Sequence, residues 1–324
     1  MKKKQIPRYR IRNWSEYNRS LISRGSLTVW LDESVLKDWG QPQPTGKRGA
    51  MPLYNDAAIV LALTLRTVYR QTLRGTQGFL QSVLGLMNLG HLPVPDYSTL
   101  CRRARRLEID LASKVANGPL HLVVDSTGCK VFGEGEWKVR KHGWSKRRTW
   151  RTIHLGVDES SGQIKAAVFT TNDFGDGEVL PRLLHQVEEP LCQVSGDGAY
   201  DQRSCYETLQ QRGEEQGLPV RAAIPPRRNA RISRHGNCRE EPLPRDENIR
   251  RVRTIGRKRW KEEVDYHRRS LAETTMFRLK TIFGDHLQSR LFENQATEMF
   301  VRCRVLNKMN ELGKPESIKI EAEL

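Results

Sequence analysis

The chain has 324 residues, of which 37% are hydrophobic, and its formal net charge at pH 7 is +17. This hydrophobic content is sufficient for a core, which excludes a disordered tail, and the length suits roughly two domains of ~150 residues. The excess of cations favours a polyanionic partner. Nucleic acid is preferred over a membrane surface, because the sequence contains no lipid-anchor motif and no amphipathic insertion helix.

The apolar runs and the cysteines of the sequence indicate neither a membrane protein nor a secreted one. The longest apolar run, 57–65, is far shorter than the ~20 residues that span a bilayer, and the N-terminus lacks the apolar core of a signal peptide. We therefore expect a cytoplasmic protein. The six cysteines form no C-x-x-C pair, which argues against a disulfide scaffold or a zinc ribbon. His235 and Cys238 have metal-like spacing, but no second pair accompanies them.

The N-terminal third of the chain has helical periodicity. Residues 1–12 carry six Lys or Arg and are expected to form a flexible basic arm. Asp96 or Ser98 can cap a helix that carries Arg102 and Arg103, which outlines a helix-turn-helix with a basic second helix. A small helical bundle with a solvated arginine face fits this segment equally well. Three segments have apolar residues at helical spacing, namely 54–71, 73–90 and 96–112.

From residue 118 onward, short strands alternate with helices. The first expected strand lies within the stretch 118–128 and ends in Asp125, and the fourth lies within 191–201 and ends at Asp197. The order βββαβαβ predicts a mixed sheet covered by helices, and it is the element order of the ribonuclease H-like fold. The other expected elements are two strands over 151–171 with a turn at 159–162, helices over 176–189 and 203–217, and a strand over 219–226.

Two dense basic stretches interrupt this region. Residues 225–261 carry 13 Lys or Arg against four acids and are expected to form a loop or small insertion that includes Arg257. Residues 137–151 carry seven cations, and Trp and Arg side chains suit stacking on exposed bases. Such runs repel themselves unless an anion neutralises them, so both are predicted to bind nucleic acid. The candidate contacts in the second stretch are Trp137, Trp144, Arg147 and Arg148.

The stretch "YHRRSLAETTMFRLK", 266–280, presents a polar stripe if it is helical. At 100° per residue, four of its residues fall within about 60° of one another on the helical wheel. They are Tyr266, Arg269, Glu273 and Lys280. Leu271, Leu279 and Ile282 fall on the opposite side, which is expected to pack. The stripe is either a solvated face with Glu-Arg and Glu-Lys pairs or a face that carries chemistry.

Three acids occupy positions that converge in this fold. Asp125 and Asp197 end two strands, and Glu273 lies on a following helix. Metal-dependent phosphoryl transfer needs such a group to hold two divalent cations. Without a cation the carboxylates repel by roughly 4 kcal/mol per pair at ~4 Å. Other acids have simpler expected roles: Asp158 and Asp173 in turns or loops, and Asp176 and Asp201 as helix caps. No motif of an esterase or nucleotide hydrolase accompanies them.

The strings "VVDSTG", "GDGAYD" and above all the spacing Y-x2-R-x3-E-x6-K resemble bacterial insertion-sequence transposases with the DDE triad, specifically the insertion sequence five family. "VWLDES", "FGEGEWKVRKHG" and "YHRRSLAET" resemble one subgroup, so the resemblance spans nearly the whole chain. It implies a transposase that binds terminal inverted repeats, hydrolyses the phosphodiester at the element ends and transfers the 3′ ends into target DNA.

The resemblance also implies the groups that would carry this reaction. Asp125, Asp197 and Glu273 would be catalytic ligands of Mg²⁺, with two ions per site and Mn²⁺ as a substitute. Arg269 and Lys280 would grip phosphates flanking the scissile bond, and Tyr266 would pack there. A homo-oligomer is expected in the synaptic complex, in a bacterial cytoplasm at the nucleoid.

The expected organisation is a helical DNA-binding region over 1–117, a ribonuclease H-like α/β catalytic domain over 118–312 with the basic insertion at 225–261, and a C-terminal tail over 313–324. Two alternatives remain open. One is a catalytically inactive DNA-binding regulator of transposition, and the other is a nuclease of the same fold that cuts without joining.

Overall fold

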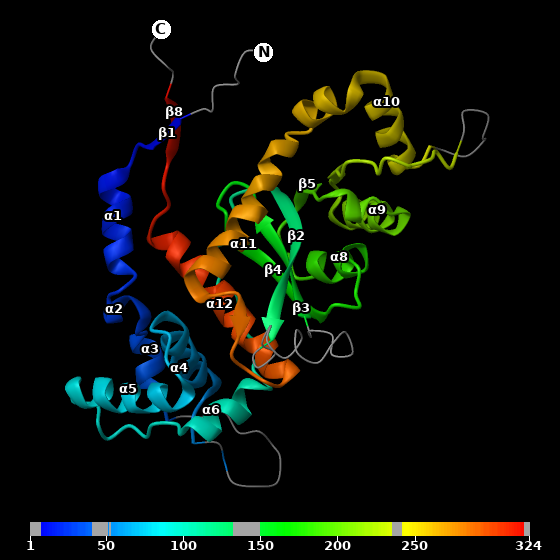
Figure 1. The fold of residues 1–324 in the computed structure, drawn as a ribbon. Coiled ribbons are helices and arrows are strands. Elements are labelled where there is room, and N and C mark those ends of the chain that lie inside the picture. The colour runs from blue at the N-terminus through cyan, green and yellow to red at the C-terminus, as the bar shows by residue number, and fades with distance from the viewer. Residues whose placement is uncertain (1–7, 41–50, 52, 132–149, 235–241, 321–324) are drawn as a thin grey trace, which may run out of the picture. The chain divides into compact units, whose positions relative to one another are not determined.

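The computed structural model describes residues 8–40, 51, 53–131, 150–234 and 242–320. The chain divides into two compact units (Figure 1), one formed by residues 1–107 with 305–324 and the other by residues 108–304. Helix α12 (Phe292–Leu312) contributes to both. None of the described helices is both long and apolar enough to cross a membrane.

The first unit is mainly helical, as the periodicity of its sequence predicts. The side chain of Asp96 caps α6 by accepting hydrogen bonds from the amides of Ser98 and Thr99, and α6 ends at Ala104, earlier than expected. Asn55 caps α4 in the same way. The helices are α1 (Trp14–Ser23), α2 (Leu27–Trp30), α3 (Glu33–Lys37), α4 (Asp56–Val68), α5 (Leu73–Leu86) and α6 (Tyr97–Ala104).

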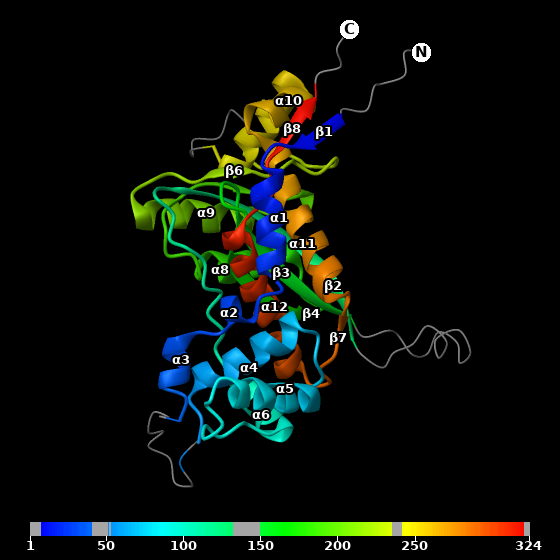
Figure 2. The ribbon, with the colours of Figure 1, turned by 90° about the vertical axis from the view of Figure 1, so that its left-hand side faces the viewer.

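A two-stranded sheet in this unit joins the two ends of the chain. Strand β1 (Arg8–Ile11) pairs antiparallel with β8 (Ser317–Ile320), so the segment near each terminus lies beside the other (Figure 2). Residues 8–11 were expected within a flexible basic arm, and for them that expectation is wrong. The pairing of residues about 300 positions apart satisfies backbone groups that a free arm would leave to water.

The second unit contains a mixed sheet, which confirms the predicted α/β class. Its strand order is β4-β3-β2-β5-β6, with β7 (His286–Leu287) beside the end of β2. Strands β2, β3 and β4 are antiparallel neighbours, whereas β5 and β6 run parallel to β2. The strands are β2 (Leu120–Val131), β3 (Trp150–Asp158), β4 (Ile164–Thr171), β5 (Leu191–Ser195) and β6 (Arg221–Ala223).

Helices cover both faces of this sheet. Alternate β2 residues such as Leu122 and Val124 face α8 (Asp176–Leu184) and α9 (Arg203–Gln216), where they join a fully buried core. Helix α11 (Ser270–Phe283), which packs against β2 and β3, follows a 3₁₀ turn η2 (Tyr266–Arg269). The residues of β2 that point away from the core, including Asp125, therefore face α11.

The basic stretch 225–261, predicted to be a loop or small insertion, is largely helical. Residues Pro244–Glu263 form α10, which bends at Gly256, whose backbone has φ 80° and ψ 152°. Pro244 suits the first turn of a helix, and Ile249 and Trp260 are buried on the packed side. The loop assignment is therefore wrong for residues 244–261, because the many arginines obscure the apolar side chains whose spacing allows a helix to pack.

Candidate functional site

The first strand carries Asp125 on its α11 face. The expectation that the strand ends at this acid is wrong, since β2 continues to Val131 by pairing with β3 along its length. Asp125 instead lies two residues beyond Val123, where the pairing with β5 stops. Its side chain is 18% exposed, and burial raises the pKa of its carboxyl, although the Ser126 amide and Arg269 favour the charged form.

Asp197 follows β5 at a tight turn. Its side chain accepts a hydrogen bond from the amide of Ala199 at 2.8 Å and so opens the short helix η1 (Gly198–Tyr200). The preceding Gly196 has no room for a side chain, because a Cβ there would lie 2.8 Å from the Tyr200 ring. The string "GDGAYD" is therefore a compact turn that fixes Asp197 at the end of a strand neighbouring that of Asp125.

Glu273 lies in the first turn of α11 and Lys280 in its last turn, whereas Tyr266 and Arg269 lie in the preceding 3₁₀ turn η2. Arg269 pairs with Glu273 at 2.5 Å, and its guanidinium lies 6.0 Å from the Tyr266 ring centroid. Lys280 donates to the Thr127 hydroxyl of β2 at 2.6 Å. The predicted opposite side is only partly packed: Leu279 is buried, whereas Leu271 and Ile282 are half-buried.

All three acids interact electrostatically with Arg269. Arg269 donates to Asp125 at 3.1 Å as well as to Glu273, and Asp197 also acts on the charges of Asp125 and Arg269. Burial tends to lower the pKa of Arg269, but Tyr266 and the acids raise it overall. Carboxylate oxygens are the ligands that Mg²⁺ prefers, so the donor types fit a divalent cation. In the part of the chain that the structure describes, no three acidic, histidine or cysteine side chains are close enough to hold one ion.

A buried ion pair anchors the turn after Asp197. The Asp201 carboxylate, fully buried, accepts two hydrogen bonds from the Arg245 guanidinium, at 2.8 and 3.1 Å. It also accepts one from the Arg227 amide, and the Arg227 side chain donates to the carbonyls of Gly198 and Ala199. The expectation that Asp201 caps a helix is wrong, because this side chain satisfies a tertiary arginine instead.

Other acids can be assigned from their partners. Asp158 accepts from Ser160 and Ser161, which confirms the predicted turn role, and Asp173 lies in a turn. Asp176 does not cap α8, whose capping position is Gly175. It lies 3.3 Å from the buried His154 ring, and the nearby His154 and Ser126 lower the pKa of its carboxyl.

Two aromatic residues near the carboxylates were missed by sequence reasoning. Phe277, one turn after Glu273, is 69% exposed and falls on the same stripe as Glu273 and Lys280. Its position on the helical wheel is the signal that would have identified it. Tyr200 is fully buried, and its hydroxyl is among the few buried polar groups of the described residues without a hydrogen-bond partner.

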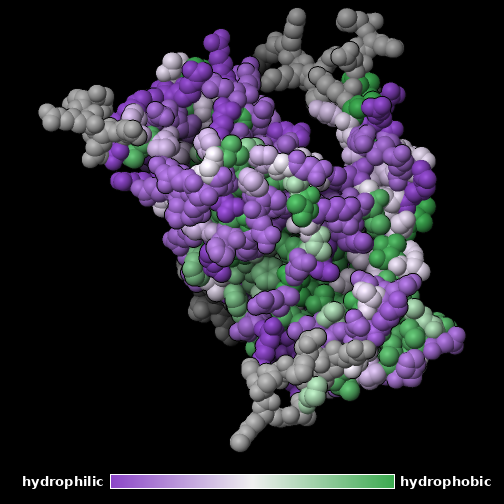
Figure 3. All heavy atoms as spheres, turned by 180° about the vertical axis from the view of Figure 1, so that it is seen from behind, coloured by the Kyte–Doolittle hydropathy of each residue, from purple (hydrophilic) through white to green (hydrophobic). Residues whose placement is uncertain are grey.

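The structure describes three of the remaining predicted DNA contacts, Arg102, Arg103 and Arg257. Arg102 is exposed on α6, whereas Arg103 is engaged by the Tyr54 carbonyl and Asp56. Arg257 is exposed on α10 and donates to the Pro226 carbonyl. Trp137, Trp144, Arg147 and Arg148 lie outside the described residues, as do His235 and Cys238. Hydrophilic residues dominate the surface view in Figure 3, interrupted by hydrophobic patches.

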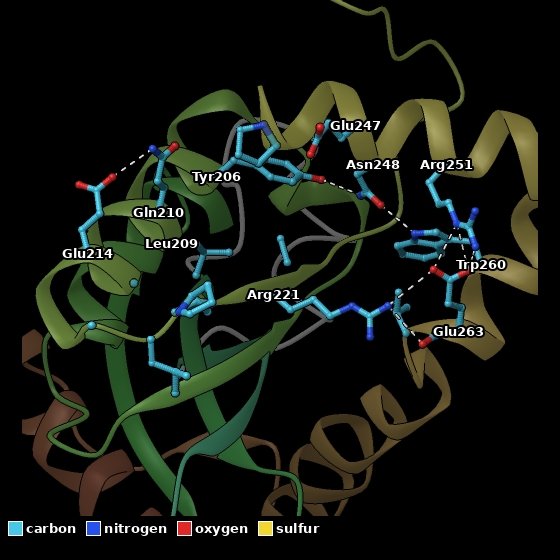
Figure 4. A pocket seen from close by; sticks show the side chains of 18 residues that line it. Tyr206, Leu209, Gln210, Glu214, Arg221, Glu247, Asn248, Arg251, Trp260 and Glu263 are labelled. Carbon is cyan, nitrogen blue, oxygen red and sulfur yellow. Dashed lines mark hydrogen bonds and ion pairs between the residues drawn. The ribbon is translucent and has the colours of Figure 1, made fainter. Parts of the chain in front are cut away.

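A cavity of about 620 Å³ lies between α9, β6 and α10. Figure 4 shows Tyr206 and Trp260 joined through Asn248, which donates to the Tyr206 hydroxyl and accepts from the Trp260 indole. Glu263 on its rim pairs with Arg251 at 2.8 Å. None of the three converging carboxylates lines this cavity, so it is separate from the acidic site.

Comparison with known proteins places these features in a family. Two family models match the chain, both described as a transposase DDE domain, over residues 22–134 and 116–308. A solved structure, "Drosophila P element transposase strand transfer complex", is 13% identical with a TM-score of 0.30. That match covers 59% of this chain and 46% of the other, so this chain spans less than half of that length. Because the second model matches more than half of the sequence, the chain belongs to the transposase DDE domain family.

Proposed function

We propose that the protein is a DNA transposase of the insertion sequence five type, which binds the terminal inverted repeats of an element, cleaves its ends and joins the 3′ ends to target DNA. The observation that carries this proposal is the gathering of Asp125, Asp197 and Glu273 around one guanidinium in a DDE transposase chain. The three acids come from a strand, the turn after a second strand and a helix, so it is the tertiary fold that brings them together.

The proposed fold of the catalytic unit is ribonuclease H-like. Three antiparallel strands are followed by helix, strand, helix and strand, and the later strands add to the sheet beside the first one. In this arrangement Asp125 lies on β2, and Asp197 lies just after the adjacent strand β5. Helix α11 then delivers Glu273 to the same region from outside the sheet.

The three carboxylates would hold Mg²⁺, with Mn²⁺ as a substitute and two ions as the expected number. When bound, the metal would activate the attacking oxygen and stabilise the leaving oxygen of the phosphodiester. The protein's own contribution is positioning. Gly196 and the hydrogen bond to Ala199 fix the turn of Asp197, and the extended pairing of β2 with β3 fixes Asp125.

The polar stripe of α11 would bind the DNA beside the scissile phosphate. Arg269 and Lys280 are cations on the face that carries Glu273, and guanidinium and ammonium groups bind phosphate oxygens. Tyr266 packs against Arg269. The exposed ring of Phe277 is placed to stack on a base. Further phosphate contacts are proposed for Arg102 and Arg257 and for the stretch that contains Trp137 and Trp144. The synaptic complex is proposed to be a homo-oligomer.

The proposal is tested with labelled DNA that carries the repeats flanking the gene. The full chain is incubated with this DNA, a target plasmid and Mg²⁺, and cut and joined products are separated on a gel. Products joined through the 3′ ends support the transposase. Cutting without joining would identify a nuclease of the same fold. Binding without cutting under Mg²⁺ or Mn²⁺ would identify a regulator.

A further inference from the structure

Arg269 bridges two of the three converging carboxylates. One of its terminal nitrogens lies 3.1 Å from an Asp125 oxygen and the other 2.5 Å from a Glu273 oxygen. Its side chain is only 19% exposed, and it is the last residue of η2. The planar guanidinium therefore spans the space between a strand acid and a helix acid.

This position gives the acids a counter-ion. The guanidinium of Arg269 is charged, as arginine side chains always are in proteins, and Asp197 also acts on its charge. Because three carboxylates this close repel one another, a cation among them favours the gathered arrangement. Arg269 thus supplies, within the chain, positive charge that a divalent cation would otherwise bring.

A guanidinium and a divalent cation that bind the same two carboxylates repel each other, so each weakens the binding of the other. Two oxygens bound to one Mg²⁺ at ~2.1 Å lie at most ~4.2 Å apart, because both touch the ion. While Arg269 pairs with Asp125 and Glu273 through different nitrogens, the two acids share a guanidinium rather than a single ion. This agrees with the lack of a metal-sized group of ligands among the residues that the structure describes.

We propose that Arg269 is a displaceable counter-ion of the acidic site: a divalent cation that binds Asp125 and Glu273 replaces it, and the released guanidinium then becomes available to a DNA phosphate. This inference rests on the proposed function for the role of the acids as metal ligands. It adds that Arg269 sets the metal affinity of the site and couples metal loading to phosphate binding.

The test measures metal binding by the full chain in the absence of DNA, with Mg²⁺ and Ca²⁺ as probes. Arg269→Gln removes the charge and keeps much of the side-chain length. Arg268→Gln is the matched control, because the neighbouring Arg268 pairs with Glu159 rather than with the acidic site. Isothermal titration gives the dissociation constant, and thermal unfolding gives the midpoint with and without metal.

Arg269→Gln should bind the metal at least ~10-fold more tightly than wild type, which corresponds to ~1.4 kcal/mol. Its unfolding midpoint should be lower than that of wild type without metal, and the gap should close at saturating metal. Arg268→Gln should match wild type in the metal dissociation constant. Arg269→Lys keeps the charge but cannot bridge both acids with a planar guanidinium, so its metal dissociation constant should lie between those of wild type and Arg269→Gln. It replaces the glutamine variant in the test if that variant does not fold.

Unchanged or weaker metal binding by Arg269→Gln would overturn the inference. An Asp125→Asn variant separates this failure from that of the proposed function. If wild type binds metal and Asp125→Asn does not, the acidic site stands and only the competition with Arg269 is refuted. If wild type and Asp125→Asn bind equally or not at all, the metal site itself is refuted, and the inference with it.

Discussion

The ion pair between Asp201 and Arg245 should contribute far more to stability than an ordinary surface pair. The Asp201 side chain is fully buried and that of Arg245 is 17% exposed. Asp201→Ala would leave an uncompensated arginine and remove the acceptor of the Arg227 amide. Truncating one partner of a buried pair costs ~3 to 5 kcal/mol, a large share of the ~5 to 15 kcal/mol that holds a typical protein folded.

The same helix region offers an internal control. Arg203 and Glu207 form an ion pair at 2.7 Å on α9, with side chains 63% and 56% exposed. Such a pair is worth ~0.2 to 1 kcal/mol. Urea unfolding of the single and double alanine variants gives a coupling energy for each pair. We expect more than ~2 kcal/mol for Asp201 with Arg245 and less than ~1 kcal/mol for Arg203 with Glu207.

Equal coupling energies for the two pairs would refute this reasoning. It would mean that Asp201 is hydrated or that Arg245 finds another partner at no cost. Asp201→Asn is a milder variant that keeps the size and one acceptor oxygen, and it should fall between wild type and Asp201→Ala.

Three further predictions concern the surroundings of the acids. Tyr200→Phe removes a buried hydroxyl without a partner among the described residues, so the free energy of unfolding should stay the same or rise by up to ~1 to 2 kcal/mol. If urea unfolding shows a fall of more than ~1 kcal/mol, the hydroxyl has a hydrogen-bond partner. Gly196→Ala should lower the free energy of unfolding by ~1 to 3 kcal/mol, because the new Cβ meets the Tyr200 ring. Gly78→Ala, with open space around the Cβ, should instead stabilise α5 by up to ~1 kcal/mol. Equal effects of the two variants would argue against the close approach of Gly196 to Tyr200. Phe277→Ala should weaken binding to terminal DNA in a shift assay by ~1 to 3 kcal/mol, and Phe277→Tyr should retain it; full binding by the alanine variant would remove the stacking role.

The element order of the second unit could be predicted because each element has its own local pattern. The alternation of short apolar runs with helical periodicity indicated strands and helices from residue 118 onward, and β2, β3, β4, α8, β5, α9 and β6 follow that order. The roles of residues in turns and helix caps could also be predicted, because their partners lie close by in the sequence. Asp158 binds the serines of its own turn, and Asp96 caps its own helix, so sequence alone identified their roles.

Features that depend on distant residues were not predicted. The pairing of β1 with β8 joins segments from opposite ends of the chain, and nothing in either short segment indicates its partner. Asp201 was read as a local cap because Arg245 lies 44 residues away. Helix α10 was missed because its charge obscured the apolar spacing of Ile249 and Trp260.

In the acidic site too, the local contact could be predicted from the sequence and the contact between distant residues could not. The pairing of Arg269 with Glu273 follows from their spacing along one helix face, and the wheel predicted it. The contact between Arg269 and Asp125 crosses 144 residues and appears only when α11 packs on β2. Sequence therefore identified the three acids and the arginine as candidates, and the structure adds that the arginine lies between two of those acids.

Asp125, Asp197 and Glu273 are proposed to carry out DNA cleavage. The most direct measurement is cleavage and joining of labelled terminal DNA in Mg²⁺ by wild type and by Asp125→Asn, Asp197→Asn and Glu273→Gln, with a shift assay on the same DNA. We predict that all three variants bind the DNA and that none cleaves or joins it, since each loses a carboxylate that would hold metal. Near-wild-type cleavage by Glu273→Gln would contradict the claim and leave Glu273 as a partner of Arg269 on a solvated helix face.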